Sequence, residues 1–480
     1  MIYIDPPYNT GKKKEFKYGD SWIDKNSGYK HSYWLSFINK RLEIAKNLLS
    51  KDGLIFISID ENEYARLKLL CDDIFTSSNF IGSFVKKISG GKNDSKTIKV
   101  NHEYLLCYKR TEKATIHLNI EYTKKDETRS LQKDGDNEER FNRENLWYPI
   151  YANIKTKEIS LEFKKDMIEI FPIKNDGLER YWRWEYDTAV KRINELRLTK
   201  TKFDDGKIKY DIGVFTPKGT RKELPWNSFI SDFSAGGGTQ LKEVLGKKIA
   251  GMYPKNLDYI KWICNLSVKK NPIILDFFAG SGTTAQAVSE IRREINPEAK
   301  FIIVDQGEYF DTLIKPRVQK VNFCSSWKNG KPVNASEGLS SIFEVIKLES
   351  YEDALNNLEL KKPKVDLFDN NPELKDDYLL NYMLDVESRG SLLSTDDFKK
   401  PFDYTMKIAV DSAGAFEEQK VDLVETFNYL IGLTVKHIDA QPDRGFVTVT
   451  GTLPSGETCL VLCGDVAWDE LPNKRRVGIL

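Results

Sequence analysis

The sequence has few of the residues on which metal and disulfide chemistry depend. Only four histidines occur among 480 residues, and the six cysteines form no CxxC pair; they are Cys71, Cys107, Cys264, Cys324, Cys459 and Cys463. Because the thiols and imidazoles are scattered, the sequence predicts no metal site. The cysteines are expected to be buried and inert. Cys459 and Cys463 stand in a strand-like run, which puts them on the same face of that strand.

Long apolar runs are also missing. The longest, Gly53–Ile59 and Ile273–Phe278, have the length of a β-strand, far short of the roughly 20 residues that cross a bilayer. Residues 1–7 lack the basic region and the apolar stretch of a signal peptide. The sequence therefore predicts a cytoplasmic protein without membrane contact, and its length predicts about two to four compact units.

An excess of charge of one sign is absent as well. The formal net charge is +1, so composition alone does not indicate a nucleic-acid-binding protein. Locally, a stretch rich in Gly, Ser and Asn holds a single acid, Asp94, among the lysines Lys86, Lys87, Lys92, Lys96 and Lys99. Taken alone, such a run is typical of a solvated loop.

What the sequence does contain is an alternation of strands and helices in two separated segments. Strands are expected over 1–4, 54–59 and 103–108 with helices over 32–50 and 61–75, and the pattern resumes with a helix over 255–266, a strand over 273–278, a helix over 283–294 and a strand over 300–304. This rhythm predicts an α/β fold with a parallel sheet and helical crossovers. The expected domains are 1–110 and 236–328, which share the sheet, an irregular and aromatic-rich insert at 111–235, and a C-terminal α+β region at 329–480.

A glycine loop follows the strand expected at 273–278. It reads Asp276-Phe277-Phe278-Ala279-Gly280-Ser281-Gly282-Thr283, and the acid Asp305 closes the next strand. Glycines allow a tight turn and a close ligand, the following helix N-terminus favours an anionic group, and Asp305 is placed to accept hydrogen bonds from ribose hydroxyls. The loop predicts a nucleoside cofactor but also satisfies GxGxxA, which leaves a dinucleotide open.

The tetrapeptide Asp5-Pro6-Pro7-Tyr8 ends the first apolar strand. The prolines fix the backbone so that the Pro6 carbonyl has a defined direction, and that carbonyl and the Asp5 carboxylate can accept both hydrogens of an amino group. Adenine N6 is a poor nucleophile, and two such acceptors concentrate electron density on it, while Tyr8 offers a face on which an extruded base can stack. A simple strand-terminating turn is the alternative interpretation.

The two motifs together resemble the amino-group DNA methyltransferases in which the tetrapeptide precedes the glycine loop, specifically the modification subunits of type III restriction systems. The resemblance extends over residues 1–110 and 220–325 and, more loosely, to two later segments. Its further motifs are Asp5–Gly11, Asp52–Glu63, Asn101–Leu106, Tyr253–Asn256, Phe343–Ser350 and Val421–Leu430.

This resemblance implies a Rossmann-like methyltransferase sheet and S-adenosylmethionine as methyl donor. It implies catalytic roles for Asp5, Pro6, Pro7 and Tyr8. It also implies that the cofactor contacts are Asp276, Phe277, Phe278, Gly280, Gly282, Thr283, Asp305 and Lys255. Asp at position 5 fits adenine N6 better than cytosine N4, which stays the alternative target.

The insert then corresponds to a target-recognition domain for double-stranded DNA, in which Arg, Asn and Gln would read base edges. The five lysines between positions 86 and 99 become phosphate contacts, and Trp182 and Trp184 are expected in the core of the insert. The implied partners are a second copy of the chain and a restriction subunit, with the region after 330 as the contact surface.

One departure from the family concerns the start of the chain. Family members carry a segment upstream of the tetrapeptide, whereas this sequence begins four residues before Asp5. The resemblance therefore implies an N-terminal truncation that removes a central or near-central strand and part of the cofactor pocket. A DNA-binding remnant without catalysis is the alternative function that follows from this departure.

Overall fold

The structure is a computed structural model. It describes residues 1–10, 28–88, 98–133, 143–173, 177–202, 208–233, 236–267, 270–307, 309–334, 338–357, 400–409 and 415–464. The chain divides into two compact units, Met1–Ser341 and Ile342–Leu480. The second unit thus begins somewhat later than the boundary at 329 expected from the sequence.

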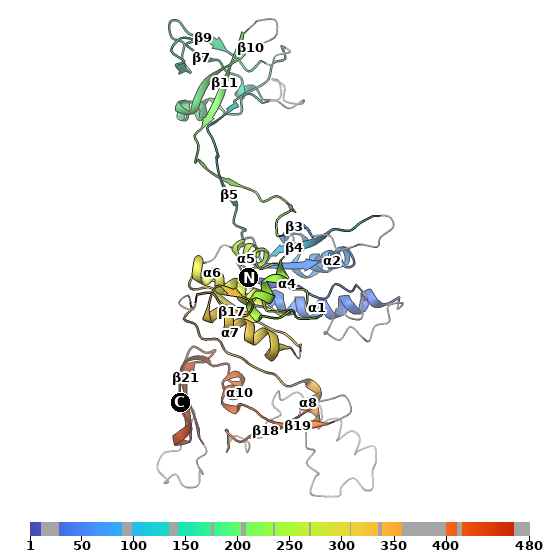
Figure 1. The fold of residues 1–480 in the computed structure, drawn as a ribbon. Helices are drawn as coiled ribbons and strands as arrows, with labels where there is room; N and C mark the ends of the chain where they lie inside the picture. The colour runs from blue at the N-terminus through green and yellow to red at the C-terminus, as the bar shows by residue number, and fades with distance from the viewer. Residues whose placement is uncertain are drawn as a thin grey trace, which may run out of the picture. The chain divides into compact units, whose positions relative to one another are not determined.

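A seven-stranded sheet organises the first unit, with the strand order β13-β3-β4-β2-β1-β14-β15. Its strands are β1 (Ile2–Ile4), β2 (Leu54–Ile59), β3 (Phe80–Lys87), β4 (His102–Lys109), β13 (Phe229–Ile230), β14 (Ile273–Asp276) and β15 (Lys300–Ile303). They come from both sides of the insert, which confirms that two separated segments build one sheet (Figure 1).

The sheet is mixed, so the prediction of a parallel sheet was wrong in one respect. β4 runs antiparallel to both β2 and β3, whereas β1, β2, β14 and β15 are parallel. β3 and β13 were not predicted, and β13 falls inside the range expected for the insert. β1 pairs with β2 on one side and with β14 on the other.

Helices cover both faces of the sheet, which explains why its central strands are mostly apolar. Every residue of β2 is buried. One face packs against α1 (Lys30–Leu48) and α2 (Tyr64–Phe75), and the other against α5 (Leu257–Asn265) and α6 (Thr283–Glu294). The helices begin and end within a few residues of the predicted ranges because their apolar residues recur at helical spacing. α4 (Gly237–Leu245), a π-helical turn (Phe310–Ile314), α7 (Lys315–Phe323) and the hairpin of β16 (Trp327–Lys328) and β17 (Lys331–Pro332) complete this part.

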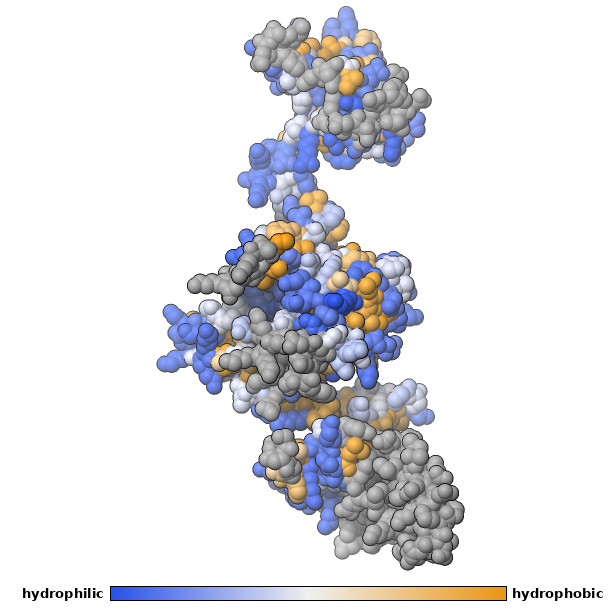
Figure 2. Space-filling model, turned by 90° about the vertical axis from the view of Figure 1, so that its right-hand side faces the viewer, coloured by the Kyte–Doolittle hydropathy of each residue, from blue (hydrophilic) through white to orange (hydrophobic). Residues whose placement is uncertain are grey.

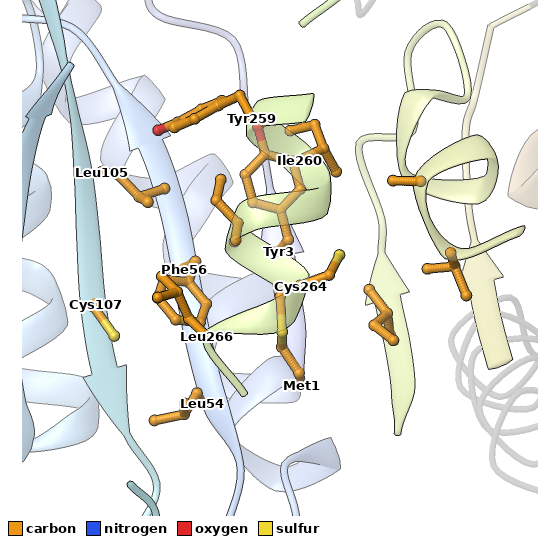
Figure 3. Packing of buried hydrophobic residues seen from close by; sticks show 14 of the residues in the cluster. Met1, Tyr3, Leu54, Phe56, Leu105, Cys107, Tyr259, Ile260, Cys264 and Leu266 are labelled. Carbon is orange, nitrogen blue, oxygen red and sulfur yellow. The ribbon is translucent and has the colours of Figure 1, made fainter. Parts of the chain in front are cut away.

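The core around β1 illustrates how alternation along a strand divides side chains between the two faces. Ile2 and Ile4 pack on the α1 and α2 side, whereas Met1 and Tyr3 turn toward α5. Figure 3 shows this second side, where labelled residues of three neighbouring strands lie against Tyr259, Ile260, Cys264 and Leu266. β1 is therefore held from both faces and both edges, which fixes the position of whatever follows it.

The insert has a hydrophobic core of its own. Trp182 lies at its centre and is fully buried, as predicted, whereas Trp184 is only partly buried at its margin. The ribbon of β5 (Asn119–Tyr122) and β12 (Arg221–Leu224) joins the insert to the rest of the chain (Figure 1). Its other elements are β6 (Glu127–Ser130), β7 (Ile150–Ala152), β8 (Ile159–Ser160), β9 (Ile168–Ile170), α3 (Tyr186–Lys191), β10 (Leu196–Lys202) and β11 (Ile208–Thr216).

The second unit contains both helices and strands. Its core forms around α10 and a three-stranded antiparallel sheet. All six cysteines are free, and Cys459 and Cys463 share one face of β22 as predicted. The elements are α8 (Tyr351–Asn356), β18 (Thr405–Ala409), β19 (Phe416–Lys420), α10 (Leu423–Leu430), β20 (Thr434–Gln441), β21 (Phe446–Thr452) and β22 (Thr458–Gly464).

Within the described ranges, no helix is long and apolar enough to cross a membrane.

Candidate active site

The two sequence motifs meet at the carboxyl ends of β1 and β14. These strands are parallel neighbours, with Ile2 opposite Leu275, so the segments that follow them leave the sheet at the same edge. The chain continues from β1 to β2 on one side and from β14 to β15 on the other. Such a reversal of winding is where open α/β sheets bind ligands.

Asp5 is held by two neighbours at this edge. The Tyr8 hydroxyl donates to Asp5 Oδ1 over 2.7 Å, and Lys255 Nζ lies 3.2 Å from the same oxygen. Within the described part of the chain, no hydrogen bond reaches Asp5 Oδ2 or the Pro6 carbonyl, whereas the Pro7 carbonyl accepts from Trp34 Nε1. The tetrapeptide therefore keeps two acceptors available, the pair that the sequence predicts for an amino group.

Lys255 links the tetrapeptide to a second, buried carboxylate. Its Nζ donates to Tyr8 Oη at 2.6 Å and to Glu103 Oε2 at 2.7 Å. Glu103 also accepts from Lys86 Nζ at 2.8 Å, and that ammonium lies 4.4 Å from the centre of the Tyr259 ring. Lys255, predicted as a cofactor contact, thus lies among the residues predicted to be catalytic.

The pKa values of this cluster follow from burial and from the paired charges. Burial raises the pKa of the Asp5 carboxyl above 3.8, and the Lys255 ammonium opposes that shift. Burial also acts on Glu103, but the charges of Lys255 and Lys86 outweigh it and hold its pKa at about 2. Burial disfavours the charged form of Lys255, yet Asp5 and Glu103 together raise its pKa above 10.5. The cluster therefore keeps a charged ammonium beside Asp5.

Glu63 is a further buried carboxylate, and it holds Asn9, the residue after the tetrapeptide. Glu63 is fully buried at the start of α2, and its Oε1 lies 2.5 Å from both Asn9 Nδ2 and His31 Nδ1. Asn9 has a φ of +56°, in the left-handed region. Because Asn tolerates this conformation better than most residues, the backbone can turn here away from the sheet.

The glycine loop is shaped by two aspartates. Asp276 accepts from Phe278 N at 3.0 Å and from Thr284 Oγ1 at 2.5 Å, and burial raises its pKa to about 7. Asp305 accepts from Gly280 N and Gly307 N, each at 2.7 Å. Gly280 and Gly282 have φ values of +54° and +75°, which side chains with a Cβ rarely adopt.

Arg317 supports this loop from behind, and sequence analysis missed it. The side chain is 1% exposed and donates to Ser281 O, Ser281 Oγ, Thr283 Oγ1 and Gln286 Oε1 at 2.8 to 3.1 Å. No carboxylate is among these partners, and burial lowers the pKa of its guanidinium to about 9. The loop therefore rests on a buried cation that fixes the backbone at the start of α6.

The remaining predicted cofactor residues lie at different depths. Phe277 and Asp305 are half-buried and can be reached from outside, whereas Phe278 is 5% exposed and belongs to the core beside α1. Thr283 is buried, and its hydroxyl faces Ser281 and Arg317. A direct contact of each with a cofactor stays a prediction.

The predicted lysine cluster does not act as one surface. Lys86 is 5% exposed and paired with Glu103, so its assignment as a phosphate contact was wrong: the ammonium has no access to a DNA backbone. Lys87 and Lys99 are exposed and keep that prediction. Lys92 and Lys96 lie outside the described residues. In the part of the chain that the structure describes, no cluster of His, Cys, Asp or Glu could hold a metal ion.

The family of this chain follows from a comparison with known protein families. The family model for N6/N4 methyltransferases, described as DNA methylase, matches residues 1–316, which include both motifs and the insert. The chain belongs to the N6/N4 DNA methylase family. It is therefore a DNA methyltransferase, and S-adenosylmethionine is its cofactor, as the sequence predicts.

Individual relatives fall into two groups. The type II methyltransferase M.KpnI of Klebsiella pneumoniae is 34% identical over 318 residues, covering 64% of this chain and 75% of that protein. The type III EcoPI Mod subunit of Escherichia phage P1 is 30% identical over 356 residues, covering 64% of this chain and 54% of the subunit. The StyLTI Mod subunit of Salmonella typhimurium is 30% identical over 338 residues, covering 66% of this chain and 50% of that subunit. The chain thus spans about half the length of these Mod subunits.

Solved structures that match are also DNA methyltransferases. The M1.HpyAVI–SAM complex matches with a TM-score of 0.29 and 13% identity over 66% of this chain and 87% of that chain. The cytosine-N4-specific PvuII DNA methyltransferase matches with a TM-score of 0.29 and 10% identity over 66% and 78%.

The geometry of the site fits S-adenosylmethionine. A nucleoside cofactor needs a close backbone approach and an acid for its ribose, and the chain offers Gly280, Gly282 and the half-buried Asp305 at one strand edge. Asp5 stands at the end of the adjacent strand, where a target amino group would meet the cofactor's methyl group.

Proposed function

We propose that this chain transfers a methyl group from S-adenosylmethionine to adenine N6 in duplex DNA, as the modification subunit of a type III restriction system. The observation that carries the proposal is the position of Asp5. It lies at the end of β1 beside the glycine loop of β14, with Oδ2 and the Pro6 carbonyl unbonded within the described residues. An aspartate at this place, rather than a serine, supports adenine as the target base.

The proposed reaction needs two acceptors and no strong base. S-adenosylmethionine supplies an electrophilic methyl group on a sulfonium. Asp5 Oδ2 and the Pro6 carbonyl accept the two N6 hydrogens, which draws the nitrogen lone pair out of conjugation with the ring. The lone pair then forms the N–C bond as the C–S bond breaks, and N6 loses one proton to Asp5 or to water.

Tyr8 and Lys255 hold Asp5 in place for this reaction. Because both contact Oδ1, the carboxylate cannot rotate freely, and Oδ2 keeps one orientation. The charge of Lys255 favours the ionised carboxylate in spite of burial. Holding reactants in one geometry accounts for a large part of enzymatic rate enhancement.

The type III assignment rests on the relatives and on the order of the motifs. Three Mod subunits of type III enzymes are about 30% identical to this chain, but a type II methyltransferase is similar to the same degree. We extend the proposal to a homodimer in the cytoplasm that binds a restriction subunit, with the second unit as the contact surface. Co-purification with a restriction subunit from the same genome tests this extension.

The catalytic part of the proposal is tested with Asp5→Ala. We expect loss of methyl transfer, more than about 100-fold, with S-adenosylmethionine affinity within about twofold of the unchanged protein, because Asp5 contacts the base and not the cofactor. Exposed Asp73 on α2 provides the control variant Asp73→Asn. Near-normal turnover of Asp5→Ala would contradict the mechanism.

Two further measurements separate the alternatives. Nucleoside analysis of methylated DNA distinguishes 6-methyladenine from 4-methylcytosine. The second product alone would overturn the adenine assignment. Absence of S-adenosylmethionine binding at millimolar concentration would instead indicate a DNA-binding remnant.

A further inference from the structure

The insert contains a hollow of about 520 Å³ whose lining is rich in arginine. The lining residues are Arg129, Ser130, Arg183, Trp184, Arg192 and Val214. Arg129 and Val214 are opposite one another on β6 and β11. Arg183 and Trp184 precede α3, and Arg192 follows it. We call this feature the arginine hollow, and three segments distant in sequence build it.

One wall of the arginine hollow is formed by Arg192 and Trp184. Arg192 donates from Nε and Nη2 to Glu195 at 2.8 and 2.6 Å, and its guanidinium carbon lies 4.2 Å from the centre of the Trp184 ring. These contacts hold the indole and the guanidinium face to face. Arg192 thus has partners inside the insert, and its presence in the lining does not by itself indicate a ligand.

Arg129 and Arg183 have no such structural explanation. Both are exposed. The Nε of Arg183 donates to Gln132 O at 3.2 Å, which leaves its terminal nitrogens without a described partner. Among the described residues, none forms a hydrogen bond or ion pair with the Arg129 side chain. The arginine hollow thus presents two guanidinium groups beside an aromatic wall, and no acid is among its described lining residues.

The chemistry of such a lining selects for paired acceptors. A guanidinium donates two parallel hydrogen bonds, which match either O6 and N7 of guanine or two oxygens of a phosphate. The half-buried Trp184, whose ring lies against the Arg192 guanidinium, adds an aromatic surface to this lining. Duplex DNA carries both kinds of acceptor, and Figure 2 shows many hydrophilic residues, with some hydrophobic ones among them, on the described surface of the insert at the top of the view.

We propose that the arginine hollow is the surface through which the insert contacts DNA, with Arg129 and Arg183 donating to paired acceptors. This inference rests on the proposed DNA methylation and assigns a place and a chemistry to sequence recognition. The acceptors come either from a guanine edge, which specifies sequence, or from phosphates, which only position the duplex.

The test uses the full chain with the double variant Arg129→Gln/Arg183→Gln. Lys165→Gln is the matched control, since Lys165 is an exposed cation of the same insert outside the arginine hollow. The readouts are the methylated sequence motif in genomic DNA and the salt dependence of duplex binding by fluorescence anisotropy. Unchanged S-adenosylmethionine affinity and an unchanged urea denaturation profile, which also includes the separate core of the insert, show that each variant is folded.

Two results support the inference and identify the acceptor. A guanine contact gives a motif that relaxes at a G·C position, with discrimination there reduced between about 5- and 100-fold. A phosphate contact leaves the motif intact but weakens binding to all duplexes, and it lowers the salt slope by about one for each phosphate that is no longer neutralised. Arg183→Lys preserves the phosphate contact and fails to restore the guanine contact.

An unchanged motif together with an unchanged salt slope would overturn the inference. Failure of the proposed function gives a different result, because the chain without substitutions then produces no methylated DNA. The anisotropy experiment needs no methylation. In that case, duplex affinity that falls in the double variant but not in Lys165→Gln supports the arginine hollow, and unchanged duplex affinity overturns it.

Discussion

Glu63 Oε1 lies 2.5 Å from Asn9 Nδ2, so a fully buried carboxylate holds the residue that follows the Asp5–Tyr8 tetrapeptide. The same oxygen also contacts His31 Nδ1 at 2.5 Å. This contact joins the starts of α1 and α2 to the segment that leaves β1. It has no direct part in the chemistry, but it determines where the backbone goes after Tyr8.

The first prediction concerns Glu63→Ala. This substitution removes the carboxylate that Asn9 and His31 contact, so we expect the free energy of unfolding to fall by about 1–3 kcal/mol. We also expect kcat to fall at least about tenfold, because Tyr8 loses its fixed position. Affinity for S-adenosylmethionine is expected to stay within about twofold. Urea denaturation and single-turnover methylation measure these effects.

Two further variants are controls for this prediction. Glu63→Gln keeps an acceptor for Asn9 and should recover part of kcat, whereas exposed Glu61→Ala should change neither stability nor kcat. Equal activity of the Ala and Gln variants would show that the contact does not position the tetrapeptide.

The second prediction concerns the pH dependence of Lys255→Met. The Lys255 charge lowers the pKa of Asp5 against the effect of burial, so its removal raises that pKa further. A smaller fraction of Asp5 is then ionised at any given pH. We expect the acid limb of the pH–rate profile to move to higher pH, with activity near pH 7 reduced on the order of tenfold and partly recovered at higher pH. Lys242→Met, an exposed lysine on α4, is the control. A uniform loss of activity across the pH range would refute the electrostatic role of Lys255.

The third prediction concerns the glycine loop. Gly282 has a φ of +75°, and an added Cβ would lie 3.4 Å from Ile314 Cγ2. A β-branched residue here is strained by at least about 1–2 kcal/mol, which distorts the loop before α6. Gly282→Val should therefore lower S-adenosylmethionine affinity at least about tenfold, as measured by calorimetry. Gly219 has a similar φ of +82° with open space around it, so Gly219→Val reproduces the strain away from the cofactor. Equal cofactor affinity of the two variants would be evidence against the loop as the cofactor site.

The fourth prediction concerns Asp276 and the stability of the fold. Its pKa is about 7 in the folded chain, above the value of 3.8 that is usual for Asp. The folded state therefore binds the proton more tightly, and this contribution to stability is present below about pH 4 and is lost as the pH rises through 7. Asparagine does not titrate, so the unfolding free energy of Asp276→Asn should fall less between pH 5 and 8 than that of the unchanged chain. The difference between the two falls is on the order of 2–4 kcal/mol at most. Urea denaturation at several pH values measures it. If the variant and the unchanged chain show parallel pH profiles, Asp276 is not the responsible group.

The sequence allowed the helices, the central strands and both motifs to be predicted because each depends on local patterns. The spacing of apolar residues in α1 and the glycines after β14 are such patterns. The partners of the motifs are not local. Glu103 and Lys255 are 152 residues apart, and nothing in the chain between them indicates that they pair.

Burial of charge was the main source of error. Lys86 stands in a run that is typical of exposed lysines, yet its ammonium is paired inside the protein. Arg317 and Glu63 are buried in the same way, and in sequence they resemble surface residues. Whether a charged residue is exposed depends on which strands become neighbours, and that depends on contacts made across the whole chain. The antiparallel direction of β4 was missed for the same reason, since it depends on the path taken by the chain between strands.

The pairing of β1 with β14 also has a consequence for synthesis. Ile2 and Leu275 are neighbours in the sheet, but the ribosome makes β14 long after β1, on the order of tens of seconds later at ~5–20 residues per second. During that interval one edge of the apolar strand that leads to Asp5 has no partner, while the insert can form its own core. A chaperone that covers this strand edge during translation is therefore expected to increase the yield of folded protein, and interruption of synthesis before β14 should give aggregates.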